Sequence, residues 1–550
     1  MSTTTPPTTA PDATPPPSST SAPARLPLSV RLRPWALLTI SGVLMFLGFA
    51  GFAMWPLAFV GMVPALFVFD PTETRGGFAR PTGWAFFFRA LWFGYVSEFG
   101  GFYWLVNTLT DFSGFPVVVC LLIASIFYLF QGLQFASVAW LWARARARGA
   151  PAALSLVEAF LASELAFPML FEHYYGTSLH PVPLLMQVAD LGGPMMCTAL
   201  TIGSAGAVYE LLSARTAGRP LPRLGPGLAA GYLLFAMGYG AYRLSTEDAR
   251  AAAAPHLEIG VVQANMGLFE KWQDPERGLA RHVEDTRALL ASPRPPDLVV
   301  WPESAVTFFL PNGLRRLGQW SLARRLGLDH LGVPIVFGGL RQVATEEGGR
   351  EDRNTAFLAG GDGAILGTYD KAYLLAFGEY LPFGETFPQL YDLSPMTGRF
   401  TPGDDPSPVT MRGPDGAELR MSVLVCYEDI VSSYVRRVVE VGDPHVLLNV
   451  TNDSWFGDTQ EPFVHLALAR FRAIEHRRPL IRATNSGVSA IIDATGRIVR
   501  QSRVFERTTL SAPVPMLAGA TTLYGLLGPW PGVVSLAAIL WMAFRRRVPS

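Results

Sequence analysis

The sequence predicts a two-part fold, in which a polytopic α-helical membrane domain of about eight transmembrane helices is joined to an α/β sandwich domain. Composition is the first reason, because 50% of the 550 residues are hydrophobic and only 16% are charged, and the mean hydropathy is +0.27. Ordinary soluble enzymes are more polar than this. Long apolar segments fill most of residues 25–249, whereas short strand-like and helix-like segments alternate in residues 250–512, a pattern typical of α/β domains.

Residues 1–24 form a separate tail of Thr, Pro, Ser and Ala, with one Asp and no basic residue. Such a segment cannot bury enough apolar surface to become ordered. It also lacks the charged start and apolar centre of a signal peptide. We therefore expect a disordered tail.

Residues 25–249 are predicted to contain seven membrane spans. Residues 34–69 carry no charge and are too long for one crossing, so they suit two short helices with a turn near Trp55 and Pro56. An eighth span lies in the C-terminal segment, residues 513–550, which ends in a basic cluster. The other expected spans are 84–105, 115–142, 152–170, 191–212, 225–242 and, for the eighth, 526–544.

Polar residues within these spans leave two questions open. Glu98, Glu158 and Glu164 are costly in an apolar segment, so they face either a polar cavity or an interface. A count of six or seven spans also remains an alternative, because the last span is short and contains Pro529 and Pro531.

Basic residues predict the orientation of the spans. Every alternate loop is basic, whereas loops 107–114 and 171–183 contain no Lys or Arg. Positive residues are retained on the cytoplasmic side, so both termini should be cytoplasmic and residues 250–512 should face the periplasm. The basic residues are Arg25, Arg31, Arg33, Arg75, Arg80, Arg144, Arg146, Arg148, Arg215, Arg219, Arg223, Arg545, Arg546 and Arg547.

The outward domain is predicted to be an α/β sandwich with helices covering a pair of sheets. It contains one cysteine and can form no internal disulfide, so its stability must come from its core and from docking on the membrane part. The expected strands are 257–262, 297–301, 334–339, 356–359, 421–425, 446–450 and 489–492. The expected helices are 276–290, 314–326, 430–441 and 462–475.

Cys426 is the candidate nucleophile of this domain. It follows an apolar, β-branched run and so lies where a buried strand ends, a position that holds a side chain rigidly at an accessible rim. Cys120 and Cys197 lie in apolar segments and are expected to be packing residues. Alone, a cysteine in such a place is more often a small buried hydrophobic residue than a catalyst.

Two upstream segments supply what a cysteine nucleophile needs. Glu303 follows the strand at 297–301, and Lys371 precedes a loop that contains Glu379. A nearby carboxylate can take the thiol proton, and a fixed ammonium can stabilise both thiolate and oxyanion. Each motif alone is weak evidence, but three in this order, each at a strand end, indicate one site.

The order of these motifs resembles the nitrilase superfamily, whose members carry a Glu-Lys-Cys triad. W-P-E-S-A holds Glu303, Y-D-K holds Lys371 with F-G-E-Y-L-P after it, and C-Y-E begins at Cys426. V-Q-A-N near Trp272, N-D-S-W-F-G at 452–457 and R-P-L-I-R-A-T-N-S-G at 478–487 resemble the apolipoprotein N-acyltransferases, membrane-embedded members of that superfamily. The likeness extends from about residue 35 to the C-terminus.

The resemblance implies a nitrilase-like α-β-β-α sandwich and a cysteine acyltransferase. Glu303 would act as base and Cys426 as nucleophile, while Lys371 and the backbone N–H of Tyr427 would hold the oxyanion. The implied donor is a phospholipid, expected to be phosphatidylethanolamine, and the implied acceptor is the α-amine of the diacylglyceryl-cysteine of an apolipoprotein. A monomer in the bacterial inner membrane is expected. The supporting residues are Glu379, Tyr427, Glu428, Trp272, Trp455 and Phe456, the last two as possible linings of a substrate entrance.

Other function classes remain open at this point. A membrane-tethered nitrilase-type amidase or hydrolase would use the same triad, and a non-enzymatic lipid-binding or transport protein would need none of it. Tyr373 and Ala376 depart from the family pattern, where histidine and proline are common, and put the geometry of the loop in doubt. We expect no cofactor or metal, because the eight histidines show no paired ligand spacing. A net charge of zero gives no reason to expect a nucleic-acid partner.

Overall fold

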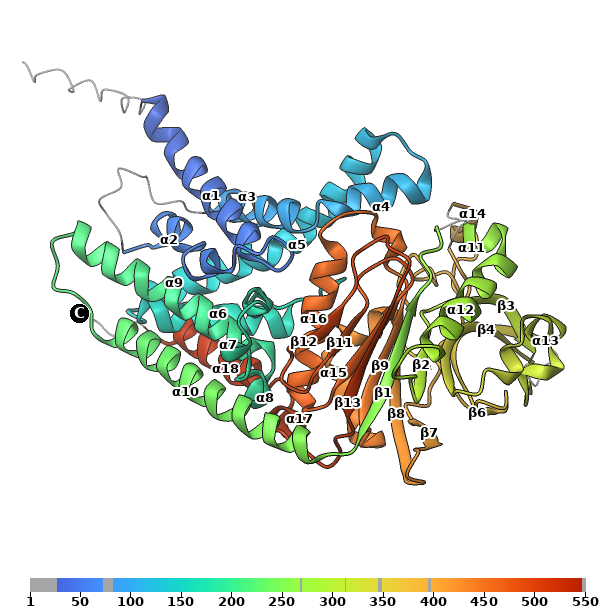
Figure 1. The fold of residues 1–550 in the computed structure, drawn as a ribbon. Helices are drawn as coiled ribbons and strands as arrows, with labels where there is room; N and C mark the ends of the chain where they lie inside the picture. The colour runs from blue at the N-terminus through green and yellow to red at the C-terminus, as the bar shows by residue number, and fades with distance from the viewer. Residues whose placement is uncertain are drawn as a thin grey trace, which may run out of the picture.

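The computed structural model describes residues 27–72, 83–267, 270–311, 313–344, 349–393 and 397–546. The predicted tail at 1–24 lies outside these residues, as does the basic loop around Arg75 and Arg80. The described chain has a helical half and a sandwich half that lie side by side (Figure 1).

The helical half contains an α-helix at most of the predicted spans. Among the described residues, three helices are long and apolar enough to cross a membrane: α1, α5 and α9. The count of eight spans stays a prediction. The helices are α1 (Leu28–Gly48), η1 (Trp55–Phe59), α2 (Val63–Phe69), α3 (Trp84–Gly101), α4 (Trp104–Ser113), α5 (Val117–Arg146), α6 (Ala152–Ala166), η2 (Tyr175–Leu179), α7 (Pro183–Met186), α8 (Ala189–Gly192), α9 (Pro194–Thr216), α10 (Leu224–Ala253), α17 (Leu523–Leu527) and α18 (Trp530–Phe544).

The sandwich half contains two facing sheets. The first has the strand order β13-β1-β2-β4-β5-β6 with β3 paired to β4, and the second has the order β12-β11-β10-β9-β8-β7. The strands are β1 (His256–Gln263), β2 (Leu298–Val300), β3 (Val306–Pro311), β4 (Ile335–Ala344), β5 (Arg350–Ala359), β6 (Ile365–Asp370), β7 (Val409–Arg412), β8 (Glu418–Val425), β9 (Val446–Thr451), β10 (Leu480–Thr484), β11 (Ala490–Ile492), β12 (Ile498–Gln501) and β13 (Thr508–Pro515).

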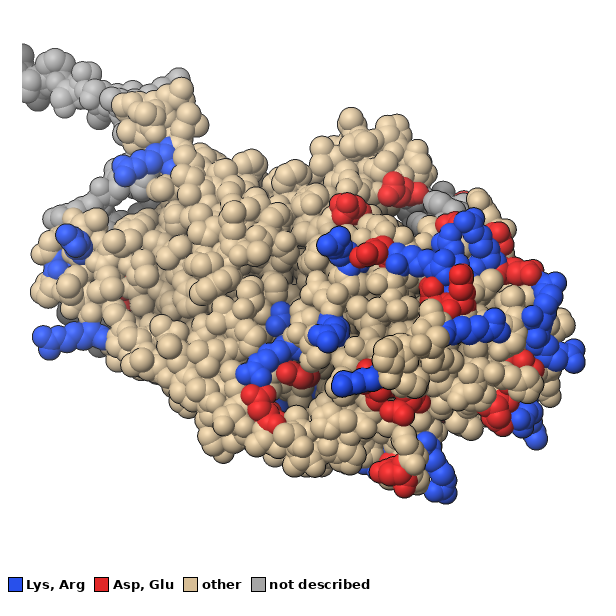
Figure 2. All heavy atoms as spheres, in the orientation of Figure 1, with Lys and Arg blue, Asp and Glu red and all other residues tan. Residues whose placement is uncertain are grey.

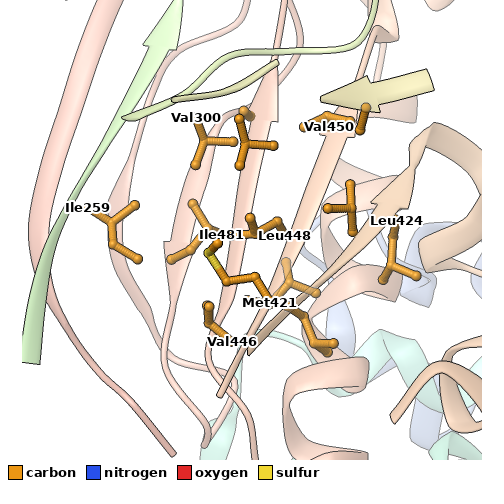
Figure 3. Packing of buried hydrophobic residues seen from close by; sticks show 14 of the residues in the cluster. Ile259, Val300, Met421, Leu424, Val446, Leu448, Val450 and Ile481 are labelled. Atoms are coloured by element: carbon orange, nitrogen blue, oxygen red, sulfur yellow. The ribbon is translucent and has the colours of Figure 1, made fainter. Parts of the chain in front are cut away.

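The core between the sheets is built from β-branched and aliphatic side chains of both. Ile259 and Val300 come from the first sheet, and Met421, Leu448 and Ile481 from the second (Figure 3). Burying such side chains is the main stabilising contribution to a sandwich. The paired sheets agree with the predicted sandwich.

Helices cover both outer faces of the sheets. Helix α12 (Pro275–Leu290) packs Leu279 and Val283 against Trp301 and Phe337 of the first sheet's outer face. Helices α15 (Ser432–Gly442) and α16 (Glu461–His476) lie against the second sheet. The remaining helices of this half are α11 (Glu270–Gln273), η3 (Leu317–Gln319), α13 (Ser321–Leu326), η4 (Leu328–His330), α14 (Leu390–Leu393), η5 (Cys426–Asp429) and η6 (Asp453–Phe456).

The predicted helix at 314–326 is shorter than expected. Trp320 has extended backbone between η3 and α13, and Gly327 ends α13 in a left-handed conformation. Strands β3, β6, β7, β10, β12 and β13 were not predicted. Most lack a clear alternating pattern, and β10 is buried along its whole length, so its residues do not alternate between polar and apolar.

Helix α16 joins the two halves and lies between the second sheet and the membrane helices (Figure 1). Val464 and Leu468 pack in one cluster with Phe49 of the helical half. At the far end of the junction, the Arg477 guanidinium binds the Asp190 carboxylate at 2.6 Å. These contacts hold the sandwich at the edge of the helical half.

Two of the three carboxylates in the predicted spans face a cavity. Glu98 and Glu164 line a space of about 30 Å³ between α1, α3, α5 and α6, large enough for a few waters. Glu164 also accepts hydrogen bonds from the Tyr175 N–H and the Thr198 hydroxyl. Of the two possibilities for these residues, the structure therefore supports the polar cavity for Glu98 and Glu164.

Candidate active site

Cys426 stands at the end of β8 in a backbone conformation that few residues adopt. Its φ is +52°, in the left-handed region, which is unfavourable for a residue with a side chain and is often found at functional sites. Its carbonyl accepts a hydrogen bond from Asn449 Nδ2 at 3.2 Å, and the nearby Thr451 side chain acts to lower the pKa of the thiol. Strand β9, which carries Asn449 and Thr451, thereby holds the turn.

Glu303 and Lys371 meet in the tertiary structure although 68 residues separate them. Glu303 follows β2, and Lys371 is the first residue after β6. The Lys371 Nζ lies 3.6 Å from Glu303 Oε1 and 2.7 Å from Glu379 Oε2. Three of the predicted site residues therefore form one buried ion-pair cluster.

Asn354 was missed in the sequence and completes this cluster. Its Nδ2 atom donates to Glu303 Oε1 at 2.8 Å and to Glu379 Oε1 at 2.9 Å. Because Asn354 lies on β5, beside β6, its amide fixes both carboxylates relative to Lys371. No local pattern marks this residue, since an Asn within a strand has no motif of its own.

The charges of the cluster act on the thiol and on the ammonium. Burial raises the pKa of the Cys426 thiol, the Glu303 charge raises it further, and the Lys371 charge lowers it. Burial alone would lower the pKa of Lys371, but Glu379 and Glu303 outweigh burial and raise it. Lys371 is thus a permanent ammonium, and the thiol needs help to ionise.

Glu428 connects Cys426 to the loop that follows Lys371. Its fully buried carboxylate accepts hydrogen bonds from the backbone N–H of Val425 at 2.7 Å, of Ala372 at 2.6 Å and of Tyr373 at 3.0 Å. The Tyr369 hydroxyl donates to it as well. The side chain therefore fixes the end of β8 relative to the residues that follow Lys371.

Tyr427, Trp455 and Phe456 lie at the contact with the helical half. The Tyr427 hydroxyl donates to the Leu170 carbonyl at 2.7 Å, and Phe456 packs edge-on against Trp104 of α4. Trp455 packs against the same aromatic cluster. The residue after the nucleophile is thereby attached to a loop of the membrane part.

Trp272 is placed differently from the other predicted residues. Its side chain is 46% exposed on α11, and its ring lies 5.6 Å from the ammonium of its neighbour Lys271. Lys271 is buried, and sequence reasoning missed it. A lysine in a short charged helix gives no local sign that it will be buried.

A buried charge network lies behind the turn at Cys426. Arg482, on β10, binds the carboxylates of Asp429 and Asp453 at 2.8 Å each and the Asn449 amide oxygen at 2.7 Å. His465 of α16 bridges the same two carboxylates, at 2.7 Å and 3.2 Å. Through Asn449, this network supports the strained turn at Cys426.

The same network contains a possible metal-ligand set. Asp453, Glu461 and His465 offer ligand atoms within 4.8 Å of one another. Arg482 already compensates Asp453, and His465 carries a proton between two carboxylates. Glu461 is compensated less well, because its buried Oε2 has no hydrogen-bond partner among the described residues.

His465 makes the stability of the fold depend on pH. Burial and Arg482 lower its pKa, but Asp429 and Asp453 outweigh them and raise it to about 10. A raised pKa in the folded state contributes stability that is complete below the unfolded value near 6.5 and lost as the pH rises through about 10. We expect the melting temperature in detergent to fall across this window, by the equivalent of about 5 kcal/mol at most, and to fall less in His465→Gln.

His282 provides a matched control for this measurement. It is equally buried, but burial lowers its pKa to about 4, so it is neutral throughout the window. His282→Gln should leave the pH slope unchanged. Equal slopes in the wild type and in His465→Gln would contradict the assigned charge of His465.

Comparison with known proteins assigns the chain to a family. Residues 258–521 match the carbon-nitrogen hydrolase model, and residues 41–207 match the apolipoprotein N-acyltransferase N-terminal domain. An apolipoprotein N-acyltransferase of Agrobacterium fabrum is 32% identical over 74% of this chain and 75% of its own length. The chain belongs to the apolipoprotein N-acyltransferase family.

Other apolipoprotein N-acyltransferases match over nearly the whole chain. The protein of Bdellovibrio bacteriovorus is 30% identical over 92% of each chain, and that of Geobacter metallireducens is 29% identical over 94% of this chain and 96% of its own length. Among solved structures, an amidase from Nesterenkonia sp. AN1 is 20% identical, covers 48% of this chain and 93% of its own, and has a TM-score of 0.34. The match to the carbon-nitrogen hydrolase model supports the nitrilase-like α/β domain that the sequence predicts. The N-acyltransferase matches and the three long apolar helices support its membrane nature.

Proposed function

We propose that the chain transfers an acyl chain from a phospholipid to the N-terminal α-amine of the diacylglyceryl-cysteine of apolipoproteins, through a thioester on Cys426. This is the last step of lipoprotein maturation. The observation that carries the catalytic part is the buried cluster of Glu303, Lys371 and Glu379, whose charges act on the Cys426 thiol. Membership of the apolipoprotein N-acyltransferase family supports the lipid and lipoprotein substrates.

The first half-reaction forms the thioester. Glu303 takes the thiol proton, Cys426 Sγ attacks an ester carbonyl of the phospholipid, and Lys371 with the backbone N–H of Tyr427 holds the oxyanion. The carbon–oxygen bond then breaks, and Glu303 returns the proton to the leaving lysophospholipid oxygen. We propose phosphatidylethanolamine as the donor.

The second half-reaction forms the amide. The neutral α-amine attacks the thioester, Glu303 takes its proton, and the carbon–sulfur bond breaks as the proton passes to the thiolate. No cofactor takes part in these steps. Water must be scarce for the thioester to persist until the amine arrives.

The position of the site supports lipid substrates. The residue after Cys426 is hydrogen-bonded to Leu170 of the helical half, so Cys426 lies beside the part of the chain that carries the proposed spans. In the view of Figure 2, most charged side chains lie on the sandwich half, and most of the helical surface carries no charged side chain. A surface embedded in a membrane requires such a distribution.

The chain termini support the proposed orientation in the bacterial inner membrane. Helix α1 runs toward the sandwich, and Gly51, shortly after its end, lies against Val464 of α16. Helix α18 runs away from the sandwich to Arg545, which hydrogen-bonds Arg148. Both ends of the described chain therefore lie on the side of the helices away from the sandwich (Figure 1). We propose cytoplasmic termini, eight spans and a periplasmic catalytic domain at 250–512.

Intact-mass spectrometry on the detergent-purified protein with phosphatidylethanolamine tests the proposal. We expect a hydroxylamine-labile mass gain of one acyl chain that is absent from Cys426→Ser and Glu303→Gln and is discharged by a diacylglyceryl peptide with a free amine. Cys120→Ser, which removes a buried thiol of α5, should retain the adduct. Loss of the adduct to water alone would indicate a hydrolase, and no adduct on a folded protein would favour a binding or transport function.

A further inference from the structure

A second buried lysine lies beside the proposed catalytic cluster. The Lys271 side chain is 5% exposed, and its backbone carbonyl accepts a hydrogen bond from Thr307 on β3, the strand that follows Glu303. Within the described ranges, its ammonium has neither a hydrogen bond nor a carboxylate within 4 Å. A lysine in such a largely buried position without an ion-pair partner is costly, so it calls for an explanation.

Lys271 and Glu303 line the same cavity. This cavity has a volume of about 10 Å³, roughly one water, and also contains Ser304, His282 and Asn485 in its wall. It is too small for a phosphate or a headgroup. The ammonium is thus placed to act on the charge of Glu303 and not to bind substrate directly.

The charge count of the cluster explains why a second ammonium is needed. Glu303 and Glu379 are two carboxylates, and both pair with the single ammonium of Lys371. Without another cation, the buried cluster carries one net negative charge. Such a charge opposes ionisation of a neighbouring thiol, and the Glu303 charge does raise the pKa of the Cys426 thiol.

We propose that Lys271 is a positioning residue of the active site, whose buried ammonium balances the second carboxylate of the Glu303–Lys371–Glu379 cluster and thereby favours the thiolate of Cys426. The proposal rests on the catalytic roles proposed for Glu303 and Cys426. It adds to the triad a fourth charged group that touches neither substrate.

The groups around Lys271 leave it charged at neutral pH. Burial lowers its pKa to about 8, while the charges of Glu303 and Cys426 act to raise it. From α12, His282 is neutral because burial lowers its pKa to about 4, and Arg281 adds a positive charge at the edge of the same region. The ammonium form therefore predominates below about pH 8.

The pH profile of thiol alkylation tests the proposal without any acyl donor. The full-length protein in detergent is treated with iodoacetamide from pH 6 to pH 10, and peptide mass spectrometry follows modification at Cys426. We expect Lys271→Met to slow alkylation about tenfold at pH 7, where Lys271 is charged, and this difference to narrow above about pH 8. At pH 7, Lys271→Arg should stay within about threefold of the wild type.

Controls separate charge from packing. Arg277→Met removes an exposed cation of the neighbouring helix and should leave the profile unchanged. The proposal is overturned if Lys271→Met, with an unchanged melting temperature, alkylates at the wild-type rate at pH 7, or if Lys271→Arg is slowed as much as Lys271→Met. A protein that alkylates as expected but forms no acyl adduct would contradict the proposed function and not this charge balance.

If Lys271→Met does not fold, Lys271→Arg provides a second test. An arginine keeps its charge at alkaline pH, whereas Lys271 loses its proton above about pH 8. Between pH 8 and 9.5, Cys426 in Lys271→Arg should therefore alkylate several-fold faster than in the wild type. Identical profiles in this range would overturn the proposal.

Discussion

Replacement of Lys371 by methionine is expected to slow acyl-enzyme formation by a factor of about 10³. The variant loses the ammonium that is placed to hold the oxyanion. It also leaves Glu303 and Glu379 buried without the cation that now lies 3.6 Å and 2.7 Å from them. We therefore expect a loss of stability of about 3–5 kcal/mol as well. Single-turnover mass spectrometry measures the rate, and melting in detergent measures the stability.

A double variant separates these two effects. The double variant Lys371→Met with Glu379→Gln removes one charge of each sign. It should therefore recover most of the stability that Lys371→Met alone loses. The rate should stay low, because no ammonium faces the oxyanion. Recovery of the rate together with the stability would show that Lys371 only balances charge.

Replacement of Arg482 by methionine is expected to give the largest loss of stability from a residue outside the proposed triad. The guanidinium is fully buried and compensates Asp429 and Asp453. Its removal leaves two buried carboxylates with only His465 between them, which costs about 3–5 kcal/mol. Acyl-enzyme formation should also slow, because Arg482 holds Asn449, whose amide binds the Cys426 carbonyl. Denaturation in mixed detergent and the single-turnover rate measure the two effects.

Arg478→Met is the matched control for this variant. Arg478 is equally buried, but its carboxylate partner Asp443 is half exposed, so water can solvate the carboxylate left behind. We expect a loss of about 1–2 kcal/mol and a normal rate. A variant at Arg482 that is no less stable than one at Arg478 would contradict the role of the buried network.

The class of the protein and the strand ends that carry the proposed triad were predictable from local patterns. Apolar segments of span length and short β-branched runs are set by neighbouring residues, so they predicted the helical half and the strands that end before Glu303 and Cys426. Edge strands such as β7 and β12 were missed because they are short and partly exposed. Helix 314–326 was overestimated because an extended Trp320 interrupts it.

The sequence by itself determined which chemical groups the chain carries and where strands present them, because these depend on spacing along the chain. Only the tertiary structure decided that Asn354 fixes both carboxylates, that Lys271 is buried beside Glu303, and that charged residues of α16 lie in the interior. Each depends on which distant segments pair, and a residue's charge does not reveal whether a partner remote in sequence will compensate it. The left-handed turn at Cys426 is likewise imposed by contacts from β9 and from Glu428, and not by the cysteine itself.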